Sequence, residues 1–135
     1  MSDYCKLGLP GSVGSCDVTH IILDKCPSEV LNLCNGKEGK PSLAFQVVVS
    51  HRKQILSISK GEYGAYNDKT IVRMDRFVSD VLMGRVMKDI ESVIYDTNGD
   101  RNVVRGVHLI TDNGYHKIPG MNCPMLFRSS MRDVF

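Results

Sequence analysis

Residues 43–51 read LAFQVVVSH, and after a short polar break the chain continues with QILSISK at 54–60. The first segment is apolar almost throughout, which is typical of a strand that is covered on both faces. The second segment alternates, so Leu56 and Ile58 are expected on one face of a strand. Two strands joined by so few polar residues predict an antiparallel hairpin.

The segments on either side predict further elements. Residues 12–23, SVGSCDVTHIIL, are rich in β-branched side chains and predict a strand. Residues 26–41 contain two prolines and two glycines, which predict a connecting loop with one helical turn. From 67 to 87 the apolar residues recur three and four apart, a spacing that predicts one amphipathic helix. Asn67 is a suitable N-cap for that helix.

A second hairpin and a last buried strand follow the helix. Segments 91–96 and 101–106 flank an Asn98-Gly99 pair, which predicts a two-residue type I′ turn with positive φ at both positions. Residues 107–111, VHLIT, predict a short buried strand that leads directly into Asp112. The elements together predict an α/β fold.

Composition restricts the classes of function. The chain has 135 residues, of which 42% are hydrophobic and 24% charged, as in a single globular domain. A long apolar run and a signal pattern are both missing, so we expect neither secretion nor membrane insertion. Five cysteines without an export signal indicate reduced thiols in the nucleus or cytoplasm. A net charge of +2 predicts no bulk electrostatic grip on nucleic acid.

Two aspartates stand out by their positions. Asp17 lies within the first predicted strand, and Asp112 follows the last one. If these strands are neighbours in the sheet, the two carboxylates share one site, and clustered carboxylates attract Mg²⁺ or Mn²⁺. The alternative makes Asp112 a turn residue and Asp17 a surface acid, and spacing alone favours that alternative.

Four blocks of sequence carry a resemblance to a known family. They are GLPGSVGSCDVTHI (8–21), GKEGKPSLAFQVVVSH (36–51), YNDKT (66–70) and GVHLITDNGYHKIP (106–119). In this order they closely resemble the nuclease domain of Harbinger-type transposases, also described as plant transposon protein or DDE superfamily endonuclease. The resemblance implies a ribonuclease-H-like mixed sheet with one main amphipathic helix. It implies a partial DDE nuclease domain over 7–124 and a degenerate or truncated tail over 125–135.

The resemblance also implies roles for individual residues. Asp17 corresponds to the first catalytic acid and Asp112 to the second, and both would hold Mg²⁺ or Mn²⁺ for DNA cleavage and strand transfer. Asp68 matches a recurrent family acid, for which stabilisation of the helix N-terminus is slightly preferred over support of the metal site. His20 and Tyr115 lie next to the acids, where they would orient the carboxylates or contact phosphate, or serve in packing.

The sequence departs from the family pattern in two respects. The third acid of the family, a glutamate on a later helix, has no counterpart here, and neither does the helical DNA-binding region that normally precedes the nuclease domain. We therefore expect a truncated, poorly active copy with DNA as its partner and no membrane association. The alternative is a non-catalytic relic or protein-interaction module, with a protein partner that supplies DNA binding.

Overall fold

The computed structural model describes residues 2–37, 39–112 and 121–122. Its helices are α1 (Ser2–Lys6), the 3₁₀ turn η1 (Ser28–Val30), α2 (Leu31–Cys34), α3 (Asp68–Met74) and α4 (Arg76–Leu82). Its strands are β1 (Ser12–Ile22), β2 (Ser42–Val49), β3 (Ile55–Ile58), β4 (Glu62–Tyr63), β5 (Glu91–Tyr95), β6 (Arg101–Arg105), β7 (His108–Ile110) and β8 (Met121–Asn122). The predicted tail at 125–135 lies outside the described residues.

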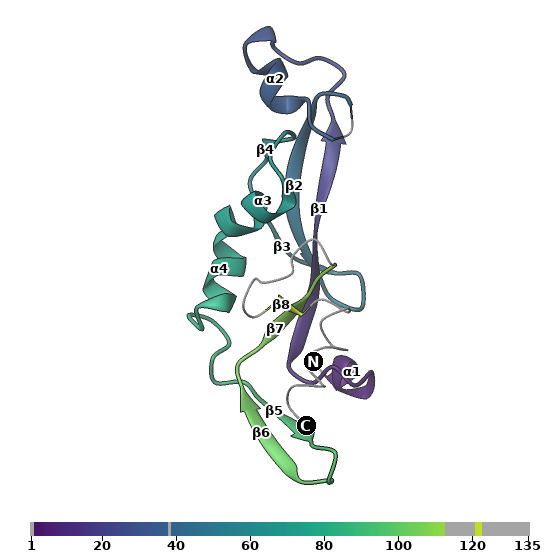
Figure 1. Cartoon of the computed structure of the whole chain (residues 1–135), viewed down its shortest axis with the longest axis vertical. Coiled ribbons are helices and arrows are strands. Elements are labelled where there is room, and N and C mark those ends of the chain that lie inside the picture. The colour runs from purple at the N-terminus through teal and green to yellow at the C-terminus, as the bar shows by residue number, and fades with distance from the viewer. Residues whose placement is uncertain (1, 38, 113–120, 123–135) are drawn as a thin grey trace.

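One mixed sheet organises the molecule (Figure 1). Its strand order is β3-β2-β1-β7-β8, and β4 pairs with β2 on the same edge as β3. The β1–β2 and β2–β3 pairs are antiparallel, whereas β1–β7 and β7–β8 are parallel. This confirms the predicted α/β class and the predicted hairpin of β2 and β3. The order also agrees with the ribonuclease-H-like sheet that the resemblance implies.

The two helices α3 and α4 cover one face of this sheet. The core joins three strand residues to three helix residues, all at most 4% exposed: Cys16, Val48, Leu109, Val72, Val78 and Val81. Along β2, buried residues alternate with half-buried ones. The prediction that 43–51 is covered on both faces is confirmed only in part, because α3 and α4 pack on one face of β2 and the residues of its other face are half-buried.

The predicted single helix over 67–87 is also wrong, because the chain forms two short helices. Asp75 lies between them in an extended conformation, and its side chain accepts a hydrogen bond from the Val78 amide at 2.7 Å. An aspartate that caps a new helix competes with continuation of the old one. Asn67 does cap α3 as predicted, since its side chain accepts from the Thr70 amide at 2.8 Å.

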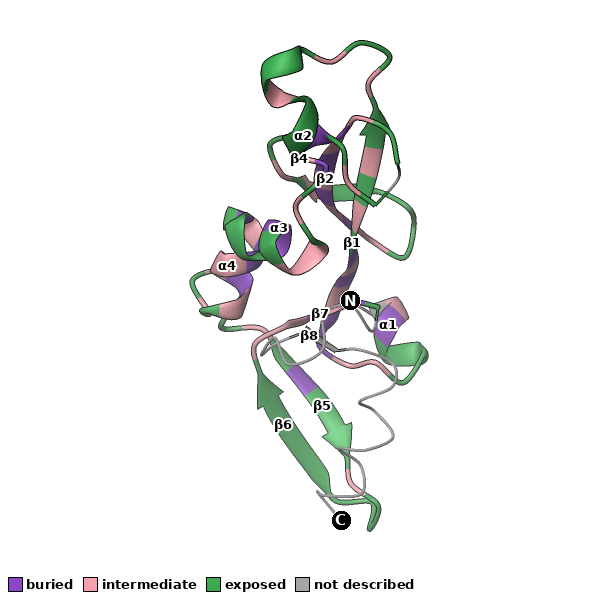
Figure 2. Ribbon diagram, turned by 45° about the horizontal axis from the view of Figure 1, so that its top comes forward, coloured by how far each residue is buried: buried purple, intermediate pink, exposed green. Residues whose placement is uncertain are grey.

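The strands β5 and β6 form a separate two-stranded sheet at one end of the molecule (Figure 1). The hairpin was predicted, but its turn differs from type I′, because Asn98 lacks the positive φ that Gly99 has. The Asp96 carboxylate accepts from the amides of Asn98 and Asp100 at 2.9 and 2.8 Å. That side chain stabilises a longer loop than the Asn-Gly pair alone predicts. In Figure 2 the hairpin is exposed except at Ser92.

Within the described residues, no helix is long and apolar enough to span a bilayer.

Candidate functional site

The parallel pairing of β1 with β7 brings the two predicted acids together. The last register pair is Ser15 with Ile110, and two residues further along each chain segment are Asp17 and Asp112. In the sequence 94 residues lie between these aspartates, and the sheet brings their two segments side by side. The adjacency of the first strand and the 107–111 strand, on which a shared site was conditional, is thus observed.

Burial shows on which side of the sheet the acids lie. Cys16 and Thr111 are 2% and 4% exposed, whereas the next residue in each segment, Asp17 or Asp112, is exposed. Because side chains alternate along a strand, the Asp17 carboxylate belongs to the face that α3 and α4 leave open. Asp112 lies two residues beyond the end of β7, and its exposure continues the alternation of that strand. Asp17 Oδ1 accepts the Val18 amide at 2.8 Å, which limits the rotation of its carboxylate.

The electrostatics of Cys16 reveal a third acid nearby. Burial raises the pKa of the Cys16 thiol to about 12, and the negative charges of Asp17, Asp75 and Asp112 add to this effect. A hydrogen bond from Gln46 acts in the opposite direction. All three carboxylates therefore surround one thiol, and this thiol stays protonated and unreactive near neutral pH.

Asp75 is the residue of this region that sequence reasoning missed. It is 4% exposed and lies on the helix-covered side of the sheet, so it does not share the open face with Asp17 and Asp112. A sequence signal existed, since an aspartate three residues before Val78 is a typical N-cap arrangement. The apolar spacing over 67–87 continues on both sides of Asp75, so it predicted one unbroken helix.

Gln46 fixes the backbone at Asp17 from the neighbouring strand. Its side chain is fully buried, and Nε2 donates to the Asp17 carbonyl and to Cys16 Sγ, both at 3.1 Å. Such a contact from β2 holds β1 at the candidate site. The sequence predicted an ordinary apolar strand here and gave no reason to select this glutamine.

The observed contacts of Asp68 do not involve Asp17 or Asp112. Its carboxylate pairs with Lys37 at 3.1 Å, and Asn67 rather than Asp68 caps α3. The pair connects the 26–41 segment to the start of α3. This contact supports a structural role, in line with the preferred interpretation of Asp68 at a helix N-terminus.

His20 and Tyr115 were the other predicted supporting residues. His20 lies three positions after Asp17 in β1, and strand alternation therefore places the two side chains on opposite faces. Its Nδ1 lies 3.2 Å from Ser42 Oγ, in hydrogen-bond contact. Tyr115 lies outside the described residues. The supporting roles of both residues stay predictions.

The donor set at the open face suits a hard divalent cation. Asp17 and Asp112 offer carboxylate oxygens, the ligand type that Mg²⁺ and Mn²⁺ prefer, and such ions keep several waters. No group of three or more His, Cys, Asp or Glu side chains in the described ranges is arranged to hold a metal ion. Asp17 and Asp112 would therefore supply part of the coordination shell of such an ion.

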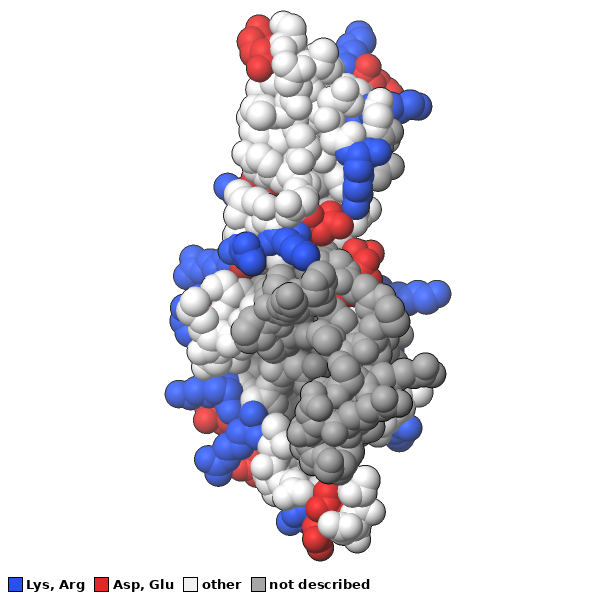
Figure 3. Space-filling view, viewed as in Figure 1, with Lys and Arg blue, Asp and Glu red and all other residues white. Residues whose placement is uncertain are grey.

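The charged surface gives no broad nucleic-acid interface. On the described part of the face in Figure 3, Lys and Arg side chains are scattered among Asp and Glu rather than gathered in one field. This pattern agrees with the small net charge of +2. Any contact with DNA would therefore depend on local groups.

Comparison with known proteins identifies the family. The sequence model of the family described as DDE superfamily endonuclease matches residues 16–131, which is most of the chain and includes Asp17 and Asp112. No curated protein and no solved structure matches the chain. Endonucleases of this superfamily usually use divalent metal ions and act on DNA. The chain belongs to the DDE superfamily of endonucleases.

Proposed function

We propose that this protein is the nuclease domain of a Harbinger-type transposase, built for metal-dependent DNA phosphodiester cleavage and strand transfer. The observation that supports this most is the parallel register of β1 and β7, which places Asp17 beside Asp112 on the open sheet face. The family match covers both residues. Of the two expected compartments, nucleus and cytoplasm, the nucleus fits a protein that acts on DNA.

The chain's own residues would act by holding and orienting. Asp17 and Asp112 would bind Mg²⁺ or Mn²⁺, which in such sites activates the attacking water and stabilises the leaving oxygen. Gln46 and the Val18 amide fix the backbone and carboxylate of Asp17, so that less ordering is needed when the ion binds. Both carboxylates are exposed, and a phosphodiester can approach them from solvent.

We propose further that the activity is low. Two carboxylates form the site on the open face among the described residues, and Asp75 lies across the sheet from them. A site built from these two carboxylates would bind metal weakly and would leave the attacking water poorly positioned.

The test is nicking of supercoiled plasmid by purified protein in millimolar Mn²⁺. We expect slow nicking that Asp17→Asn and Asp112→Asn both abolish. The matched control is Asp100→Asn, since Asp100 is an exposed aspartate of the distant hairpin turn. Nicking that survives both site variants would contradict the assignment, as would equal loss in the control.

A second function, a non-catalytic protein-interaction module, is favoured by exposed apolar residues at the sheet edge. Ile55 and Ile58 of β3 are 66% and 57% exposed. Contiguous exposed apolar surface marks interaction sites. Folded protein that binds Mn²⁺ at neither aspartate and never nicks DNA would decide for this function over the first.

A further inference from the structure

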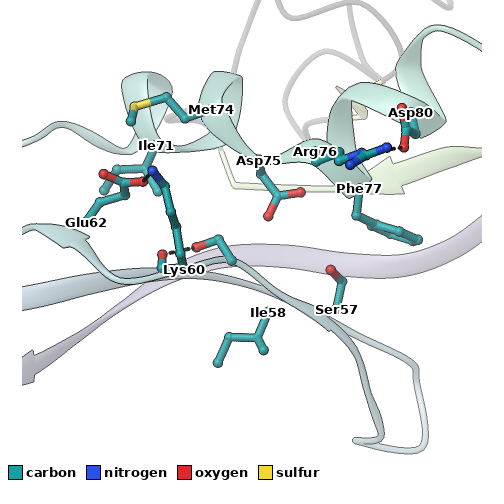
Figure 4. A pocket seen from close by; sticks show the side chains of 11 residues that line it. Ser57, Ile58, Lys60, Glu62, Ile71, Met74, Asp75, Arg76, Phe77 and Asp80 are labelled. Atoms are coloured by element: carbon teal, nitrogen blue, oxygen red, sulfur yellow. Dashed lines mark hydrogen bonds and ion pairs between the residues drawn. The ribbon is translucent and has the colours of Figure 1, made fainter.

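A cleft of about 510 Å³ lies between the sheet edge and the two helices (Figure 4). Four consecutive residues from Ser57 to Lys60 line one wall, so the cleft runs along β3 and the segment after it. Ile71, Met74 and Phe77 supply the apolar part of the opposite wall. Its size is within the range of clefts that bind ligands.

The cleft exists because a small residue of the sheet, Ser57, lies beneath the helices. Ser57 pairs with Val48, whose side chain belongs to the core under α3 and α4. Figure 4 shows the small Ser57 side chain directed toward Phe77, where a large apolar residue would close the space. The helices therefore overhang the edge of the sheet without filling it.

One buried acid of this cleft forms no ion pair with the described residues. Asp75 is 4% exposed, lines the cleft and forms no ion pair within the described residues. Among the described residues, its carboxylate accepts the capping hydrogen bond from the Val78 amide. A buried carboxylate without a counter-ion is costly, and a cation that enters the cleft would relieve that cost.

The cations of the cleft are already paired at its rim. Lys60 Nζ lies 3.3 Å from Glu62 Oε1. Arg76 Nε lies 3.9 Å from Asp80 Oδ2, and Arg85, which is outside the cleft lining, pairs with Asp80 Oδ1. Both basic side chains of the lining are at least 79% exposed, whereas Asp75 lies at the back. The lining holds three acids and two bases, and Arg85 pairs with Asp80 from outside it. Asp75 is the acid of the lining that forms no ion pair among the described residues.

The wall beside this charge is an edge of the sheet. β3 and β4 follow one another along the same side of β2, and no described strand pairs with their outer side. An unpaired edge can receive an extended segment, whose alternate side chains then point into an adjoining pocket.

We propose that this cleft binds an extended segment of a partner protein that adds to the β3 edge and inserts an arginine or lysine side chain. The apolar stem of that side chain lies against Met74 and Phe77, and its cation meets Asp75. The cleft is distinct from Asp17 and Asp112 on the open face, so the assignment holds whether or not the domain cleaves DNA.

The test uses synthetic peptides and fluorescence anisotropy on the full chain. The probe is the extended pentapeptide Thr-Val-Arg-Val-Thr, and its matched partner carries citrulline, a neutral isostere, in place of arginine. We expect the arginine peptide to bind, and we expect affinity to fall about tenfold for the citrulline peptide, as for a lost charge-assisted hydrogen bond. Equal binding of the two peptides, or no binding of either, overturns the proposal.

Two protein variants locate the binding. Asp75→Asn removes the charge and keeps an N-cap, so it should fold normally and lose the preference for arginine over citrulline. Ser57→Leu fills the cleft and leaves the charge, and it should abolish binding of both peptides. Unchanged binding in either folded variant contradicts the site. If arginine amide binds as tightly as the peptide, the cleft serves free small cations and the extended-segment assignment is wrong.

Discussion

The central sheet and the β5–β6 hairpin are built from similar sequences and end in opposite environments. Both are rich in β-branched residues, yet Val48 and Leu109 of the sheet are fully buried, whereas Val103 and Val104 of the hairpin are 47% and 46% exposed. The sheet strands have helices α3 and α4 over one face, and the hairpin has no such cover among the described elements. Strand formation therefore follows the local sequence, but burial depends on what packs against the strand.

The difference should appear in stability. A lone two-stranded hairpin is marginal in water, while a sheet with a helical layer forms a cooperative unit. The next four experiments test that contrast, from the largest expected effect to the smallest.

Thiol reactivity should differ most between the two regions. Cys16 in β1 has a pKa raised by burial from 9.0 to about 12, so at pH 8 its thiolate fraction is about a thousandfold lower than that of an ordinary thiol. We expect Val104→Cys in β6 to react with iodoacetamide faster by about that factor, as followed by peptide mass spectrometry.

The pH profile sharpens this comparison. The rate at Cys16 should keep rising with pH until about 12, whereas the rate at the Val104→Cys thiol should level off above its ordinary pKa. Exposed Cys5 is the internal reference. Similar rates at Cys16 and Cys5 would mean that the core around β1 opens readily.

Truncation of a core side chain should separate the regions thermodynamically. Leu109→Ala removes a fully buried side chain and should lower the free energy of unfolding by about 3 kcal/mol, as in other cores. Val104→Ala in the hairpin should lower it by less than about 1 kcal/mol, because that side chain is half exposed. Urea denaturation followed by circular dichroism measures both, and equal losses would disprove the contrast.

A substitution at Asp75, between α3 and α4, should weaken the helical layer over the sheet. Asp75→Ala removes the cap of α4 and should cost about 1 kcal/mol, whereas Asp75→Asn keeps the capping acceptor and should cost much less. The midpoint of thermal unfolding reports the difference. A loss in Asp75→Asn as large as in Asp75→Ala would show that charge, rather than capping, is what Asp75 contributes to stability.

The ion pair of the hairpin should matter least. Arg105 Nε lies 2.9 Å from Glu91 Oε1, but the two side chains are 77% and 50% exposed. Exposed pairs contribute little, so Arg105→Ala should change the free energy of unfolding by about 0.3 kcal/mol and high salt should remove even that. A change above about 1 kcal/mol would mean that the hairpin is coupled to the core.

The strands and the neighbouring acids were predictable because their signals are local or follow from simple topology. The apolar segments at 12–23, 43–51 and 107–111 all contain strands, and β1 and β7, whose adjacency was the condition for a shared site, do pair. That pairing made the proximity of Asp17 and Asp112 predictable. Their catalytic and metal-binding roles stay predictions, supported by the family match.

The failures share a physical cause, which is competition by single polar side chains and by tertiary cover. Asp75 interrupts an apolar spacing that otherwise continues through it, and Asp96 reshapes a turn that Asn98-Gly99 would close alone. The half-buried face of β2 depends on which side the helices occupy, and no pattern within the strand encodes that.

The parallel contact of β1 with β7 also sets the order in which the molecule assembles. Ser12 pairs with His108, so the chain must close a loop of more than ninety residues before this contact forms. Long-range pairings of this kind form late, because closing the loop costs chain entropy before the contact contributes any stabilisation. During synthesis, β1, β2 and β3 can pair first, before the segment that carries Asp112 reaches β1. The Asp17 and Asp112 segments of the candidate site therefore come together only in the final stage of folding.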